Sequence, residues 1–194
     1  MRVFLAGASG AIGRQLVPLL VGEGHMVGGM TRTPAKAEML RELGAEPFVV
    51  DVYEAERLRD AVVGFEPGAL VHQLTDLPAD PARIPEMARA NSRVRTEGTR
   101  NLLAAAAAAD VPRFVAQSIA WRLPERDQLA VEEHEAMVLD AGGVVLRYGR
   151  FYGPGTYHPE EGDLPEPPAV HVAEAARRTV AALEAEPGIL TVVD

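Results

Sequence analysis

The chain has no cysteine and a single lysine, Lys36, among its 194 residues. Disulfide bonds, thiolate nucleophiles and cysteine-ligated metals are therefore excluded, and we expect no bound metal. No basic tail or stripe offsets the net charge of −9, so a nucleic-acid partner is not expected. No apolar run approaches the roughly 18 residues that a membrane span needs, and the sequence predicts a cytoplasmic protein without membrane segments.

What is present is typical of a globular protein. Hydrophobic residues make up 47% of the chain and charged residues 24%. This length suits one domain with a substantial hydrophobic core. We therefore expect residues 1–194 to form a single domain.

Short apolar runs alternate with segments of helical periodicity along the chain. The expected strands are residues 3–6, 26–30, 47–50, 69–72, 113–118, 144–147 and 188–193. The expected helices are residues 11–21, 34–43, 54–62, 86–109, 129–140 and 170–185. This alternation predicts an α/β fold with a doubly wound parallel sheet between two helical layers. Residues 151–168 hold five of the fifteen prolines, and we expect no regular structure there.

A glycine-rich loop joins the first expected strand to the first expected helix. It reads Gly7-Ala8-Ser9-Gly10-Ala11-Ile12-Gly13. In this context Gly7 permits a tight turn, Gly10 lets the backbone approach a pyrophosphate, and Gly13 lets the helix pack closely on the sheet. The phosphates would meet free backbone N–H groups at the positive end of the helix dipole. The loop therefore predicts a Rossmann-type dinucleotide site.

The residues after the second expected strand bear on which dinucleotide binds. A carboxylate there would accept hydrogen bonds from the adenosine ribose and favour NAD. Here the strand is followed by Thr31-Arg32-Thr33. An arginine suits a 2′-phosphate because its planar donors can bind two oxygens at once. The sequence favours NADP(H), with NAD as the alternative.

The spacing Gly-x-x-Gly-x-x-Gly resembles that of the extended and atypical short-chain dehydrogenase/reductases, the NAD-dependent epimerase/dehydratase family. Other segments are similar to the motifs of that family in the same order along the chain. They are residues 70–74 (LVHQL), 97–103 (EGTRNLL), 113–118 (RFVAQS), 146–155 (LRYGRFYGPG), 170–172 (VHV) and 191–194 (TVVD). The resemblance implies that Gln73, Leu74 and Thr75 line the nicotinamide side of the cofactor, and that the fifth strand delivers an active-site serine, Ser118. It also implies that Asp51 and Val52, after the third strand, lie near the adenine, although Asp51 could equally cap the next helix.

The chain departs from this family in its catalytic residues. The tyrosine that serves as acid and base needs a lysine four residues later, because a nearby cation stabilises its phenolate. Placing Glu135 at the family's helix glutamate puts Asp127 and Val131 at those two positions. Tyr148 and Tyr152 are the candidate proton donors instead. The family's long-helix asparagine is replaced by Arg95.

Two functions remain open at this stage. One is an NAD(P)-dependent oxidoreductase or epimerase-like enzyme acting on a small molecule, with a reduced substrate-binding region at residues 151–170. The other is a non-catalytic dinucleotide-binding sensor or partner-binding module, which the missing Tyr-x-x-x-Lys pair motivates. The resemblance also implies a homodimer through the long helix near residues 86–109.

Overall fold

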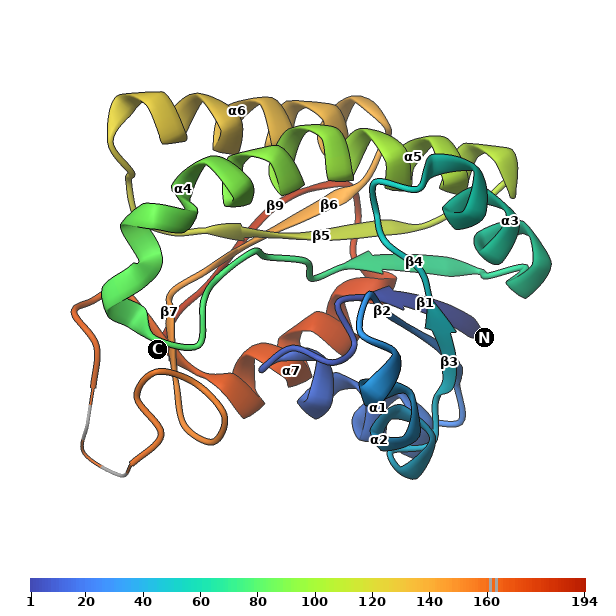
Figure 1. Ribbon diagram of the computed structural model, residues 1–194, viewed down its shortest axis with the longest axis horizontal. Coiled ribbons are helices and arrows are strands. Elements are labelled where there is room, and N and C mark those ends of the chain that lie inside the picture. Colours follow the sequence, from blue (N-terminus) through green and yellow to red (C-terminus); the bar gives the residue numbers. More distant parts are fainter. Residues whose placement is uncertain (161, 163) are drawn as a thin grey trace.

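The main sheet of the protein has seven parallel strands in the order β3-β2-β1-β4-β5-β6-β9, as a computed structural model shows (Figure 1). The structure describes residues 1–160, 162 and 164–194. The strands of this sheet are β1 (Arg2–Ala6), β2 (Met26–Thr31), β3 (Glu46–Val49), β4 (Ala69–His72), β5 (Phe114–Ile119), β6 (Val144–Tyr148) and β9 (Gly188–Val192). The order reverses between β1 and β4, which is the switch point of a doubly wound fold.

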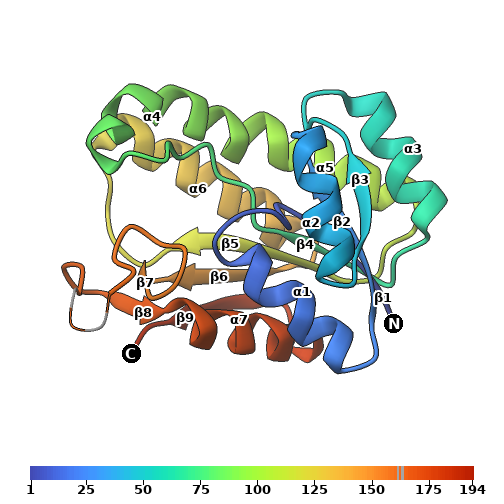
Figure 2. The ribbon, with the colours of Figure 1, turned by 60° about the horizontal axis from the view of Figure 1, so that its bottom comes forward.

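Helices cover both faces of the sheet (Figures 1 and 2). One layer contains α1 (Gly13–Gly22), α2 (Ala37–Glu42) and α7 (Val172–Ala181). The other contains α3 (Ala55–Phe65), α4 (Ile84–Arg93), α5 (Thr99–Ala108) and α6 (Glu125–Asp140). Alternate residues of each strand point to opposite layers. In β1, for example, Val3 and Leu5 join the α1/α7 core, whereas Phe4 and Ala6 join the α3/α5 core. The predicted fold class is confirmed.

The long helix of the sequence prediction is divided in the structure. A π-helical turn, η3 (Val94–Gly98), joins α4 to α5 without interrupting the path of the helix. Short 3-10 turns lie at η1 (Pro34–Lys36), η2 (Pro81–Arg83) and η4 (Ala182–Glu184). Helix α6 begins at Glu125, four residues before the predicted start at residue 129. The prediction missed this first turn because it is polar and carries no apolar periodicity.

Two predicted boundaries near the end of the chain were wrong. Residues 151–168 were expected to lack regular structure, yet β7 (Arg150–Tyr152) pairs in parallel with β8 (Ala169–His171). The expected helix from residue 170 begins two residues later, since 169–171 belong to β8 and the Nδ1 of His171 accepts a hydrogen bond from the N–H of Ala173. Strands β7 and β8 have three residues each, which is too short for a sequence periodicity to show. They form by pairing with each other across the proline-rich stretch.

Candidate functional site

The glycine loop leaves β1 and turns sharply into α1. Gly7 has a φ of 92°, and a Cβ there would lie 2.8 Å from the carbonyl carbon of Gln73. A Cβ on Gly13 would lie 2.3 Å from the carbonyl oxygen of Gly7. The N–H of Gly10 donates to that same oxygen at 3.0 Å. Gly7 and Gly13 are therefore the positions at which this tight turn tolerates no side chain.

The first turn of α1 has no side-chain cap. The helix begins at Gly13, and its N-cap residue, Ile12, has no polar side chain. The N–H groups of Arg14 and Gln15 donate to the carbonyls of Gly10 and Ile12, which leaves the N–H of Gly13 without an acceptor among the described residues. No acidic residue occupies this first turn. Free N–H groups and the helix dipole together favour an anion at this point. Ser9 ties the loop to β2, because its Oγ lies 3.1 Å from the Oγ1 of Thr31. The loop thus fits a dinucleotide pyrophosphate.

A cavity of about 550 Å³ lies beyond the ends of β2 and β3, and Arg32, Asp51, Tyr53 and Arg57 line it. Arg32 has a side chain 58% exposed, and its Nη2 donates to the Oδ1 of Asp76 at 2.8 Å. The carboxylate of Asp51 accepts the N–H of Tyr53 at 3.0 Å. Two of the residues predicted to lie near the adenosine, Arg32 and Asp51, therefore line one cavity.

Val52 and Thr31, predicted to lie near the adenosine, do not line this cavity. The side chain of Val52 is buried in the core between the sheet and α3. Its carbonyl oxygen accepts a hydrogen bond from the Nδ2 of Asn101 at 2.9 Å. Thr31 is also buried, and its Oγ1 accepts the N–H of Thr33 at 3.2 Å. The residue directly after β2 is Arg32, so no carboxylate stands at that position.

The three predicted residues after β4 take different positions. Gln73 is buried, and its Nε2 donates to the hydroxyl of Tyr148 at 3.0 Å. The carbonyl of Leu74 accepts from the Nε2 of Gln117 at 3.2 Å. Leu74 is half-buried and packs against the α3/α5 core, and Thr75 is exposed. The amide of Gln73 faces inward.

Ser118 is buried and belongs to a charged cluster that spans β5, α6 and β6. Its Oγ donates to the Oε1 of Glu135 at 2.5 Å. The guanidinium of Arg147 binds both oxygens of the same carboxylate, with Nε–Oε1 at 2.9 Å and Nη2–Oε2 at 2.5 Å. Burial opposes ionisation of Glu135, but the hydrogen bonds from Arg147 and Ser118 outweigh it and lower the carboxyl pKa. In this structure the hydroxyl of Ser118 therefore donates its hydrogen bond to an ionised carboxylate.

Tyr148 is also engaged in the interior. Thr179 donates its hydroxyl proton to the carbonyl of Ala175 at 2.6 Å, so Tyr148 must donate to the Oγ1 of Thr179, which lies 2.6 Å away. Its own oxygen accepts from Gln73. Burial raises the pKa of the phenol well above its usual value. A phenol buried in this way is a poor acid at neutral pH.

Tyr152 lies nearer the surface, at the end of β7. Its hydroxyl donates to the Oδ2 of Asp194 at 2.8 Å. This hydrogen bond, with a smaller contribution from burial, raises the phenol pKa. The only lysine, Lys36, lies in η1 at the end of the sheet beyond β2. Neither tyrosine is paired with a lysine.

A chain of buried hydrogen bonds links His72, at the end of β4, to His134 of α6. The Nδ1 of His72 accepts the N–H of Leu74, so its Nε2 must donate to the Oγ1 of Thr99 at 3.1 Å. Thr99 in turn donates to the Nδ1 of His134 at 2.7 Å, and the Nε2 of His134 donates to the carbonyl of Gln117 at 2.8 Å. Burial lowers the pKa of both imidazoles. Both are neutral and hold β4, β5, α5 and α6 together.

The segment between β7 and β8 reaches back over the loop region. The Nη2 of Arg14, in the first turn of α1, lies beside Gly155, 2.8 Å from the place a Cβ would occupy. The hydroxyl of Tyr157 donates to the carbonyl of Pro78, in the loop after β4. The same segment therefore contacts both sides of the switch point, next to the predicted phosphate site.

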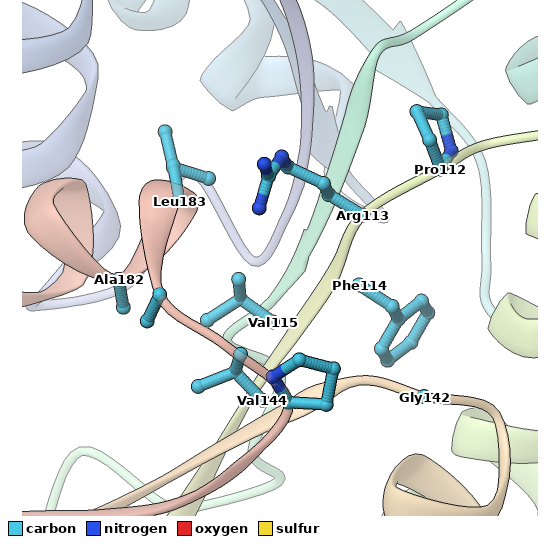
Figure 3. Close-up of a pocket in the computed structure, with 10 residues that line it drawn as sticks. Pro112, Arg113, Phe114, Val115, Gly142, Val144, Ala182 and Leu183 are labelled. Carbon is cyan, nitrogen blue, oxygen red and sulfur yellow. The ribbon is translucent and has the colours of Figure 1, made fainter.

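A second cavity, of about 270 Å³, lies away from this site (Figure 3). It is lined by Pro112, Arg113, Phe114, Val115, Gly142, Val144, Ala182, Leu183, Ala185 and Pro187. Phe114 and Val144 are the first residues of β5 and β6. Because the strands are parallel, this cavity is at the amino edge of the sheet, opposite the glycine loop.

Two structural features are absent from the part of the chain that the structure describes. That part contains no group of three or more histidine, aspartate or glutamate side chains arranged to hold a metal ion. None of its helices combines the length and apolar character that crossing a bilayer would require.

The parallel sheet order, the glycine turn and the uncapped helix define a Rossmann-type dinucleotide-binding protein. A family profile described as NAD(P)H-binding matches residues 7–139. The chain therefore belongs to the NAD(P)H-binding family, and it is an NAD(P)-binding protein of the atypical short-chain dehydrogenase/reductase type.

Individual relatives are reductases and proteins with other roles. The chain is 34% identical to the 3-diazoavenalumate denitrifying reductase of a Streptomyces species, over 235 aligned positions that cover 100% of the chain and 76% of that protein. It is 31% identical to a photosystem II assembly factor of Cyanophora paradoxa, over 61% of the chain and 34% of that protein.

Solved structures show the same fold at lower identity. The UDP-glucose 4-epimerase of Thermus thermophilus, in complex with NAD, has a TM-score of 0.78 and 22% identity, covering 100% of this chain and 78% of the epimerase. The UDP-glucose 4-epimerase of Thermotoga maritima has a TM-score of 0.80 and 16% identity, covering 100% and 77%. At these identities the likeness concerns the fold.

Proposed function

We propose that this protein is an NADPH-dependent reductase whose substrate needs hydride but no proton from a tyrosine. The observation that carries the proposal is the contrast between the two halves of the site. The glycine turn fits a pyrophosphate, whereas the buried phenol of Tyr148 is bonded to Thr179 and faces no lysine. When bound, NADPH supplies the hydride.

NADPH is proposed over NADH because of the adenosine cavity. Arg32 and Arg57 line this cavity together, and the residue after β2 is not a carboxylate. A 2′-phosphate is a dianion that a guanidinium can bind through two hydrogen bonds. Arg32 already has an acidic partner in Asp76, so its side chain is held at the rim of the cavity. We propose that it turns to the phosphate when NADPH binds.

An aryl diazo compound is the acceptor class that suits such a site. The Streptomyces relative is named as a denitrifying reductase of a diazo compound. In the reduction of an aryl diazonium ion, one hydride forms a C–H bond while the C–N bond breaks and N₂ leaves. The reaction consumes no proton. A site without the tyrosine–lysine pair can therefore support it by positioning the acceptor.

The remaining predicted site residues, apart from Tyr152, have proposed roles that differ from general acid catalysis. Ser118 orders the Glu135–Arg147 pair at the ends of β5 and β6. Leu74 and Thr75 line the nicotinamide side. Tyr152 would donate the proton if a carbonyl were reduced. We further propose that residues 1–194 act as one domain with a reduced substrate region at residues 151–170.

The test compares two acceptor classes with NADPH deuterated at the transferable position. Substituted benzenediazonium salts need hydride only, whereas benzaldehydes also need a proton. We expect deuterium in the arene product, detected by mass spectrometry, above the rate without enzyme. The Gly13→Ala variant, with its disrupted glycine turn, is the matched protein control. Transfer to aldehydes but not to diazonium ions would contradict the acceptor class.

A second candidate is a non-catalytic binding protein. The buried hydroxyls of Ser118 and Tyr148 and the relative named as an assembly factor favour it. It predicts tight NADPH binding with no deuterium transfer to either class. A homodimer through residues 86–109 would suit both candidates, since α4 has no buried residue in the single chain. Sedimentation analysis measures that association directly.

A further inference from the structure

Arg95 is a buried cation whose Nε lacks a hydrogen-bond partner. The residue is only 5% exposed, and its buried Nε meets no acceptor among the residues that the structure describes. Buried arginines are almost always paired, because an unmatched charge away from water is costly. Arg95 also lies in the π-helical turn η3, and such turns occur frequently at functional sites.

Two acidic side chains act on Arg95 electrostatically, and each accepts a hydrogen bond from another residue. Asp127 and Glu135 of α6 are the carboxylates that act on it electrostatically. The Oδ1 of Asp127 accepts the hydroxyl of Ser92 at 3.2 Å, and both oxygens of Glu135 are bound by Arg147. The other ionisable neighbours, His72 and His134, are neutral. Burial is the main reason that the pKa of Arg95 is lowered, although the guanidinium stays charged at neutral pH.

Arg95 lies on the side of the fold where the substrate is expected and not beside the expected phosphate site. The α4–η3–α5 helix connects the end of β4 to the start of β5, so its earlier residues lie nearer the carboxyl edge of the sheet. Thr99 contacts His72, the last residue of β4, and Arg95 precedes Thr99 by one turn. This edge belongs to the half of a doubly wound fold opposite the adenosine half. The glycine loop lies at the end of β1, across the switch point.

We propose that Arg95 binds a carboxylate of the substrate and anchors it at the nicotinamide end of the crevice. A carboxylate fits because a guanidinium presents parallel donors to its two oxygens. Two observations carry this assignment, the Nε of Arg95 without a hydrogen-bond partner and its position at the edge beyond β4. Calling the ligand a substrate rests on the proposed reductase function. The presence of an anion site at Arg95 does not depend on that function.

The experiment measures binding without turnover. Sodium cinnamate, an aryl carboxylate, and cinnamamide, its neutral analogue, are titrated by calorimetry into the NADP⁺ complex. Arg95→Gln removes the charge, Arg95→Lys keeps it, and Arg100→Gln is the control because Arg100 is an exposed residue of the same helix that pairs with Glu133. We expect cinnamate affinity to fall about tenfold or more in Arg95→Gln. We expect a smaller loss in Arg95→Lys and none in Arg100→Gln.

A second measurement uses the wild-type protein, so that the test does not depend on the folding of the Arg95 variants. The arginine Nε–H resonance of Arg95, assigned by comparison with Arg95→Lys, should shift when cinnamate is added but not when cinnamamide is added. Equal affinity for the two probes, or unchanged cinnamate affinity in Arg95→Gln, would overturn the anion site. Because neither probe is reduced, this result is independent of whether diazonium ions accept hydride.

Discussion

Substituting Gly13 by alanine should abolish dinucleotide binding while leaving a folded protein. The added Cβ would lie 2.3 Å from the carbonyl oxygen of Gly7 and 2.6 Å from the carbonyl group of Ala8. These are backbone atoms, so no rotamer change relieves the contact, and α1 must move away from the loop. Overpacking of this kind costs about 1–3 kcal/mol. For a chain of this size the melting temperature should fall by about 2–12 °C.

Gly22 provides the matched control at the other end of the same helix. A Cβ there would meet nothing within 4 Å. Gly22→Ala should therefore stabilise the helix by about 0.5–1 kcal/mol and leave NADPH binding unchanged. Calorimetric titration of NADPH and thermal melting of both variants provide the readouts. If Gly13→Ala bound NADPH like the wild type, the fit of the glycine turn to the pyrophosphate would be refuted.

The remaining predictions concern cofactor choice and pH. Arg32→Gln should weaken NADPH binding by about 10- to 100-fold, because a charge-assisted hydrogen bond is lost, and leave NADH binding unchanged in parallel titrations; equal losses for both would contradict the 2′-phosphate role. The buried imidazoles of His72 and His134 have pKa values below the ordinary 6.5. Their contribution to stability should therefore be complete above pH 6.5 and decline as the pH falls, by up to about 1.4 kcal/mol per pH unit for each histidine. Urea unfolding between pH 7 and 5 measures this slope, which His134→Asn should reduce; an unchanged slope would show that His134 is not the titrating group.

The fold class could be predicted because its signals are local. Apolar runs such as residues 3–6 and 69–72 read as buried strands, and the glycines of the first loop mark the turn into α1. The boundaries were harder where a segment is polar or short. Helix α6 begins with charged residues, and β7 and β8 have only three residues each. Their strand conformation depends on pairing with each other rather than on any pattern within them.

The candidate site divides in the same way. The sequence by itself determined the glycine turn, the absence of a carboxylate after β2 and the absence of a lysine partner for any tyrosine, because each is a property of neighbouring residues. Only the tertiary structure decided what the side chains contact. Ser118 meets Glu135 across 17 residues of chain, and Tyr148 meets Thr179 across 31. Burial likewise left Arg95 with an unpaired Nε. Such contacts arise when the sheet and its two helical layers close on one another, and no spacing along the chain encodes them.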